Sequence, residues 1–156
     1  MALHTFSAET FPLLRGRRTR LRAPRADDAA ALASLLPDAD GYLVECAEHL
    51  ARGDRIDWIV TTHDDDDAIG TCTLYDIDAR TRYAEIGYAL VPAARGSGFA
   101  TDACTRVIDW AMRALRLERI DAQVEPDNYP SQRVLLRVGF VPDAPDRYCF
   151  VDRSSR

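Results

Sequence analysis

The sequence contains no lysine, so all 20 of its basic side chains are arginines. A P-loop needs Gly-Lys-Ser/Thr after its glycines, and this absence excludes that class of nucleotide-binding protein. The chain also lacks any apolar run near the ~18 residues of a membrane span. Residues 1–18 lack the basic start and long apolar core of a signal peptide. We therefore expect a cytoplasmic protein that does not bind a membrane.

Cysteine is scarce too, and acidic side chains are in excess. The four cysteines are scattered without the spacing of a metal site: Cys46, Cys72, Cys104 and Cys149. We interpret them as reduced cysteines that pack in the core, and we expect no metal. The net charge of −5 argues against a nucleic-acid binder and is compatible with a cationic or amine substrate.

The most informative segment covers residues 83–103 and reads YAEIGYALVPAARGSGFATDA. It predicts a strand over 83–91, a break at Pro92, a loop of small residues and a helix over 101–115. Gly96 and Gly98 let the backbone approach an anion without a Cβ in the way. A glycine-rich turn that opens a helix points several unsatisfied N–H groups at one positive spot. The segment predicts a phosphate-bearing ligand; the alternative is a glycine-softened helix start without a ligand.

The loop has a motif, Arg95-x-x-Gly98-x-Ala100, directly after the strand that ends in Val91-Pro92. It resembles the pyrophosphate loop of the GNAT acetyltransferases, which reads Gln/Arg-x-x-Gly-x-Gly/Ala. The order of the later motifs resembles the second half of the same family: a strand over 120–124, then Asn128-x-x-Ser131, then Gly139-Phe140. Arg20-Leu21-Arg22 with Asp28-Ala29 resembles the opening of the RimJ/RimL-type branch, which acetylates protein N-termini and other amines. The resemblance runs from about Arg20 to Phe150.

We expect a single domain over residues 1–156 with an α/β fold, in which helices flank a mixed sheet. The predicted strands cover 18–23, 57–62, 68–77, 83–91, 120–124 and 148–151. The predicted helices cover 27–36, 42–52, 101–115 and 131–138. The resemblance implies the GNAT fold, with antiparallel N-terminal strands followed by two parallel strands, 83–91 and 120–124, that splay apart.

An acidic segment, residues 63–67, reads HDDDD between two strands that are predicted to pair. Like charges on adjacent residues repel one another, and such runs are typical of a solvated hairpin tip. The alternative is a cation site.

The resemblance implies that acetyl-CoA is the acyl donor and that its pantetheine arm lies between the splayed strands. Its amides would bond to free backbone groups near Leu90 and Val91. Its phosphates would lie on the loop: on the N–H groups of Gly96, Gly98 and Ala100, the hydroxyls of Ser97 and Thr101, and the charge of Arg95. Asn128 would bind the pantetheine through its amide; the alternative is an Asx turn after the strand.

The resemblance also implies a base and a proton donor for acetyl transfer to an amine. Glu85 is the candidate base, acting through a water; the alternative is a cross-strand partner for an arginine. Many family members have a tyrosine seven residues after the Asn128 position, where this chain has Leu135. The candidate donor to the leaving thiolate is therefore Ser131, whose alternative role is the N-cap of its helix. Tyr88, Tyr129 and Tyr148 are reserve donors.

The expected acceptor is a primary amine, either a protein N-terminus or a small molecule. An N-terminal amine, with a pKa of about 7.7–8.0, asks less of a base than a lysine with a pKa near 10.4. A homodimer is compatible with the sequence, although no motif indicates it. The rival hypothesis is a non-catalytic acyl-CoA-binding regulatory or interaction domain, and Leu135 is its best support.

Overall fold

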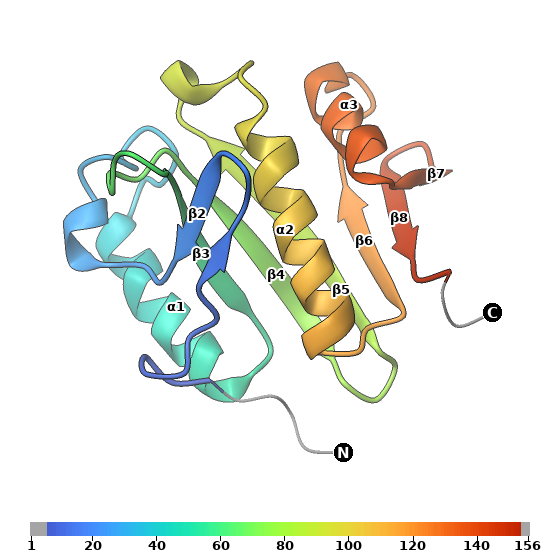
Figure 1. Ribbon diagram of the computed structural model, residues 1–156, viewed down its shortest axis with the longest axis horizontal. Coiled ribbons are helices and arrows are strands. Elements are labelled where there is room, and N and C mark those ends of the chain that lie inside the picture. The colour runs from blue at the N-terminus through green and yellow to red at the C-terminus, as the bar shows by residue number, and fades with distance from the viewer. Residues whose placement is uncertain (1–5, 154–156) are drawn as a thin grey trace.

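The structure is a computed structural model that describes residues 6–153. Its centre is an eight-stranded mixed sheet in the order β1-β2-β3-β4-β5-β6-β8-β7 (Figure 1). The strands are β1 (Leu14–Arg15), β2 (Thr19–Arg22), β3 (Ile56–Thr62), β4 (Gly70–Asp78), β5 (Tyr83–Leu90), β6 (Arg119–Gln123), β7 (Val141–Ala144) and β8 (Arg147–Val151). The helices are η1 (Ala26–Asp28), α1 (Ala39–Arg52), η2 (Pro92–Ala94), α2 (Phe99–Ala114) and α3 (Tyr129–Val138).

The pairing of the strands confirms the predicted mixed sheet. Strands β1 to β5 pair antiparallel in sequence order, and β8 pairs antiparallel with β6 and β7. Only β5 and β6 are parallel, since the chain crosses from one to the other through α2. This arrangement matches the fold that the motifs implied.

Helix α2 covers one face of the sheet and lies in front of β4 and β5 in Figure 1. Its buried side chains recur mostly every three or four residues, the spacing of one helix face: Ala103, Cys104, Val107, Ile108 and Ala111. Burying each larger apolar side chain stabilises the fold by about 1.5–3 kcal/mol. Trp110 adds a T-shaped contact with Trp58 of β3, at 5.5 Å between ring centroids. All four cysteines are buried and free, as predicted.

Helix α1 begins earlier than predicted. Asp38 lies between the predicted helices 27–36 and 42–52, and its side chain accepts a hydrogen bond from the Gly41 N–H and caps the helix that starts at Ala39. The helix ends at Arg52, as predicted. None of the helices described between residues 6 and 153 is long and apolar enough to cross a membrane.

The helix predicted over 27–36 is wrong. The chain forms only the short η1 and then a series of turns. Within η1, Asp28 is buried and forms two hydrogen bonds with the Arg22 guanidinium, at 2.7 and 3.0 Å. Arg22 also pairs with Asp66 in the acidic hairpin tip, and so does Arg25. Asp66 is therefore paired with arginines, while the aspartates of the 63–67 segment are exposed, as expected for a solvated hairpin tip.

The pairing of β5 with β6 stops after three residues. The last paired residues are Glu85 and Asp121, and beyond them β5 continues to Leu90 without a partner on that side. Figure 1 shows the two strands diverging toward the N-terminal end of α2 and toward α3. This divergence is the predicted splay, and we call the space between the strands the wedge.

Candidate active site

The turn that opens α2 leaves a cluster of backbone N–H groups without partners. Gly96 and Gly98 have φ angles of 81° and 84°, in the left-handed region that a glycine adopts without strain. Within residues 6–153, none of the six N–H groups from Gly96 to Thr101 donates an intrachain hydrogen bond. The first N–H group that does so is that of Asp102, which bonds the Gly98 carbonyl at 3.1 Å. Such a helix start is suited to bind an anion.

A cavity of about 270 Å³ adjoins these N–H groups, between α2 and α3. Two of the side chains that line it, Arg133 and Arg137, are exposed and form no ion pair with another described residue. No motif in the sequence had pointed to these two arginines. Arg95, the predicted source of positive charge, turns back instead and donates from Nε to the Leu90 carbonyl at 3.1 Å.

A second cavity, of about 320 Å³, fills the wedge between β5 and β6. The Val91 N–H donates a hydrogen bond to the Ile69 carbonyl at 2.9 Å, and the Val91 carbonyl accepts one from the Ala94 N–H. Both backbone groups are therefore occupied, contrary to the expectation that they face a ligand. Because the residues of an antiparallel ladder alternate, the backbone groups of Tyr88 and Leu90 point away from β4 instead. These N–H groups face the side that β6 has left.

Ser131 lies in the wedge cavity with its Oγ 2.5 Å from the phenol oxygen of Tyr88. The residue that caps α3 is Asn128, whose Oδ1 accepts from the Ser131 N–H at 3.2 Å. The alternative role of Ser131 as N-cap is therefore wrong, and its hydroxyl is available for chemistry. Asn128 also lines the cavity, and its capping oxygen is engaged as the Asx alternative anticipated.

Burial raises the pKa of the Tyr88 phenol, and the hydrogen bond with Ser131 offsets part of this rise. Tyr88 therefore keeps its proton through neutral pH and can donate it. The other two reserve donors lie elsewhere. Tyr129 is 62% exposed, and Tyr148 is buried on β8. Leu135 is 1% exposed and belongs to the apolar core.

Glu85 is buried at the closed end of the wedge, at the last position where β5 and β6 pair. It accepts a hydrogen bond from the Tyr83 phenol at 3.1 Å, and Tyr83 also contacts Asp121. Glu85 forms no ion pair with an arginine among the described residues, so the structure does not favour the alternative role. It lines neither the wedge cavity nor the cavity on the opposite face, and no hydrogen bond links it to Ser131.

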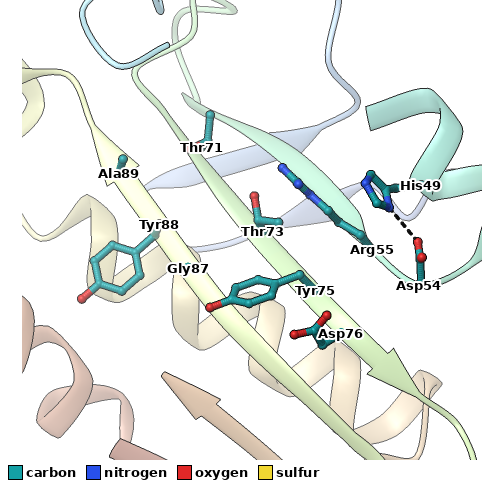
Figure 2. Close-up of a pocket in the computed structure, with 10 residues that line it drawn as sticks. All are labelled: His49, Asp54, Arg55, Thr71, Thr73, Tyr75, Asp76, Gly87, Tyr88 and Ala89. Atoms are coloured by element: carbon teal, nitrogen blue, oxygen red, sulfur yellow. Dashed lines mark hydrogen bonds and ion pairs between the residues drawn. The ribbon is translucent and has the colours of Figure 1, made fainter. Parts of the chain in front are cut away.

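A further cavity, of about 460 Å³, opens on the α1 side of the sheet (Figure 2). Gly87 and Tyr88 line both this cavity and the wedge cavity. The middle of β5 is therefore the partition between two hollows on opposite faces of the sheet. Such an arrangement allows two molecules to meet at one strand.

A family model for the GNAT acetyltransferase domain matches residues 18–141. The chain belongs to the GNAT acetyltransferase family. The uncharacterized N-acetyltransferase p20 of Bacillus licheniformis is 44% identical over 75 residues, which cover 48% of this chain and 42% of that protein. The chain spans about half the length of the curated relatives it matches.

Solved structures share the GNAT fold. An acetyltransferase from Agrobacterium tumefaciens superposes with a TM-score of 0.78 at 21% identity, over 97% of this chain and 99% of that one. RimJ of Mycobacterium smegmatis, solved in complex with CoA-disulfide, gives a TM-score of 0.75 at 23% identity, over 90% of this chain and 86% of that one. At these identities the likeness concerns the fold.

Two features of this GNAT site escaped the sequence. Tyr88 was only one of three reserve donors, because nothing local indicates that β5 and the start of α3 meet. Arg18 was not considered, yet its guanidinium donates to the Ser97 carbonyl and stacks over Phe99, with 5.2 Å to the ring centroid. Ser97 and Thr101 lie on the loop as expected, and Thr101 lines two cavities beside it.

Proposed function

We propose that this chain is an acetyl-CoA-dependent N-acetyltransferase whose acceptor is a primary amine, on a protein N-terminus or a small molecule. One observation carries the proposal: the six unpartnered N–H groups at the start of α2 lie beside a cavity that follows α3 toward the wedge. These groups suit the diphosphate of coenzyme A. On the side that β6 has left, the N–H groups of Tyr88 and Leu90 and the Tyr88 carbonyl suit the amides of its pantetheine arm.

In the proposed reaction the acceptor nitrogen attacks the thioester carbonyl carbon directly. The C–N bond forms and the C–S bond breaks, the amine loses a proton, and the sulfur of coenzyme A gains one. No covalent enzyme intermediate is needed. Ser131 would donate the proton to the sulfur, and the Tyr88 phenol would support it from 2.5 Å away.

Glu85 would accept the amine proton through a water, as the buried carboxylate at the closed end of the wedge. Its only hydrogen-bond donor among the described side chains is the Tyr83 phenol, which leaves acceptor capacity on the carboxylate. The backbone N–H groups of Tyr88 and Leu90 are the candidate donors to the oxyanion, because Val91 is occupied.

The test compares two substitutions at Gly98. In Gly98→Asp a carboxylate lies where a phosphate is expected, so we expect binding of CoA to be lost. Gly98→Asn is the matched control, because Asn has the same size and tolerates the left-handed backbone similarly without the charge. A Cβ at this position would lie 3.2 Å from the flexible end of Arg18, so both variants fit.

The measurement is CoA binding by calorimetry, together with CoA release in the presence of a panel of amines, peptides and antibiotics. Equal CoA affinities for wild type and Gly98→Asp would remove the assignment of the phosphate loop. Tight CoA binding without turnover of any amine would instead establish the non-catalytic acyl-CoA-binding domain.

A further inference from the structure

The cavity on the α1 face is lined by alternate residues of β4 together with Asp76, by residues 87–89 of β5, by His49 near the end of α1 and by residues 54–55 just before β3 (Figure 2). Its lining contains both acidic and basic side chains, and its volume of about 460 Å³ accommodates a small organic molecule or a few residues of a peptide. Because Gly87 and Tyr88 also line the wedge cavity, a molecule held here lies beside the place proposed for the thioester.

One of its carboxylates is placed there by a β-bulge. Tyr75 pairs with Glu85 and Asp78 pairs with Tyr83, so β4 contains one more residue than β5 over this interval. Before the bulge, side chains alternate regularly, with Cys72 and Leu74 in the core. Continued alternation would bury Asp76 beneath the sheet.

The extra residue changes which side chain enters the core. Asp76 adopts a left-handed backbone, with φ 51°, and its side chain is exposed beside Tyr75 on the cavity face. Ile77 then takes the core position and is 7% exposed. Bulges are typical where a strand turns a functional side chain toward a site.

Asp76 is also the unbalanced charge of the cavity. The Arg55 guanidinium is neutralised by Asp57, at 2.8 Å, and Asp54 pairs with His49 at 2.9 Å and with Arg52 at 3.6 Å. Asp76 forms no hydrogen bond or ion pair with another described residue. Burial raises the pKa of the Tyr75 phenol, and the charges of Glu85 and then of Asp76 add to this rise. The cavity therefore contains one unpaired negative charge, which favours binding of a cation.

We propose that this cavity is the acceptor site and that Asp76 binds a second positive charge on the acceptor, beyond the amine that reacts. The acceptor class is an aliphatic amine with an additional ammonium or guanidinium group. This inference rests on the proposed transfer reaction, but binding of the amine can be measured without turnover. Two sources share the chemistry: a free diamine, and a peptide N-terminus followed by a basic residue.

The experiment is an NMR titration of the 17.4 kDa protein saturated with CoA, following backbone amides that line the cavity, such as those of Thr73 and Gly87. Two matched pairs serve as probes: 1,4-diaminobutane against n-butylamine, and the tripeptide Ser-Arg-Ala against Ser-Ala-Ala. We expect the dicationic member of at least one pair to bind about three- to fivefold more tightly, as fits an exposed ion pair. The pair that shows the preference identifies the source.

The decisive variant is Asp76→Asn, which removes the charge and tolerates the left-handed backbone as Asp does. We expect it to abolish the preference and leave binding of the monocationic probe unchanged. Asp64→Asn, an exposed carboxylate in the 63–67 hairpin tip, is the control and should keep the preference.

Equal affinities within both pairs, or a preference that survives Asp76→Asn, would overturn the inference. Either result can occur while the amine panel is acetylated normally, in which case the proposed transfer reaction stands without this specificity. Loss of all CoA binding would instead refute the transfer reaction itself, and the amine titration of the free protein would still report on Asp76.

Discussion

At the scale of single residues, the proposed proton donation depends on the contact between Tyr88 and Ser131. The family's usual tyrosine position is Leu135, which is buried in the core and has no proton to give. A phenol reaches Ser131 nevertheless, from β5 rather than from α3. Because burial raises the pKa of Tyr88, this phenol remains protonated at neutral pH.

We predict that Tyr88→Phe and Ser131→Ala each lower kcat about ten- to a hundredfold, as fits loss of a positioned proton donor, with little change in KM for acetyl-CoA. The two residues act as one unit, so the double variant should lose little more than either single variant. Steady-state kinetics with any amine that is turned over makes the comparison.

Tyr129→Phe is the control, because this tyrosine is exposed and its phenol forms no hydrogen bond with another described residue. It should behave as the wild type. If Ser131→Ala only lowers the melting temperature and leaves kcat unchanged, Ser131 is a structural residue and the proton comes from elsewhere.

At the scale of secondary-structure elements, Asp102 in the first turn of α2 holds the β1–β2 turn beside the phosphate loop. Its carboxylate accepts from the N–H groups of Arg17, Arg18 and Thr19, and from the Thr19 hydroxyl at 2.7 Å. Gly16 is required in the turn, because a Cβ there would lie 2.3 Å from Asp102. The same turn carries Arg18, which reaches Ser97 in the loop.

We predict that Asp102→Ala lowers the free energy of unfolding by about 1–3 kcal/mol at pH 7, since several donors lose their acceptor. Burial raises the pKa of Asp102, but the hydrogen bonds from Thr19, Arg18 and Arg17 outweigh it and leave the pKa below its ordinary value. A carboxyl whose pKa is lowered by folding stabilises the protein above its unfolded pKa of about 3.9.

The contribution is lost as the pH falls through the lower, folded pKa. The difference between wild type and variant should therefore be constant from about pH 7 to pH 5 and shrink below about pH 4. Urea unfolding at several pH values measures it. Asp109→Ala, on the same helix with only long ion pairs of 3.7 and 4.0 Å, is the control and should cost less than about 0.5 kcal/mol. A difference that grows on acidification would contradict the assignment.

At the scale of the whole molecule, an acidic protein concentrates arginines where it is proposed to bind an anion. The net charge is −5, yet a cavity of about 690 Å³ beside the phosphate loop is lined by five of them: Arg15, Arg17, Arg18, Arg106 and Arg137. Arg137 lines the cavity between α2 and α3 as well. The local charge is therefore opposite in sign to the charge of the whole chain.

We predict that CoA binding weakens about three- to tenfold when the salt concentration rises from about 0.1 M to about 1 M, because the Debye length falls from about 10 to about 3 Å. Arg137→Gln should weaken binding at low salt and reduce the salt dependence. Arg80→Gln, in the exposed turn between β4 and β5, should change neither. Calorimetry at several salt concentrations gives the affinities, and salt-independent binding by the wild type would contradict the electrostatic contribution.

The sequence by itself determined the features that depend on neighbouring residues. The apolar stripe of α2 and the glycine turn before it follow from local periodicity and from backbone preferences. The GNAT fold was implied by the resemblance of the Arg95-x-x-Gly98-x-Ala100 and Asn128-x-x-Ser131 motifs to that family, and the glycine turn indicated a site for an anion. The local pattern also misled once, since residues 27–36 have a helical pattern but form only the short η1 and a series of turns.

Only the tertiary structure decided which distant side chains meet. The Tyr88 phenol reaches Ser131 across 43 positions of sequence, and Asp102 reaches the β1–β2 turn across more than 80. The bulge that exposes Asp76 depends on how β4 aligns with β5. Such contacts are set by strand register and by the packing of helices on the sheet. Because no local preference encodes either, the chemistry of the site became visible only when the elements were assembled.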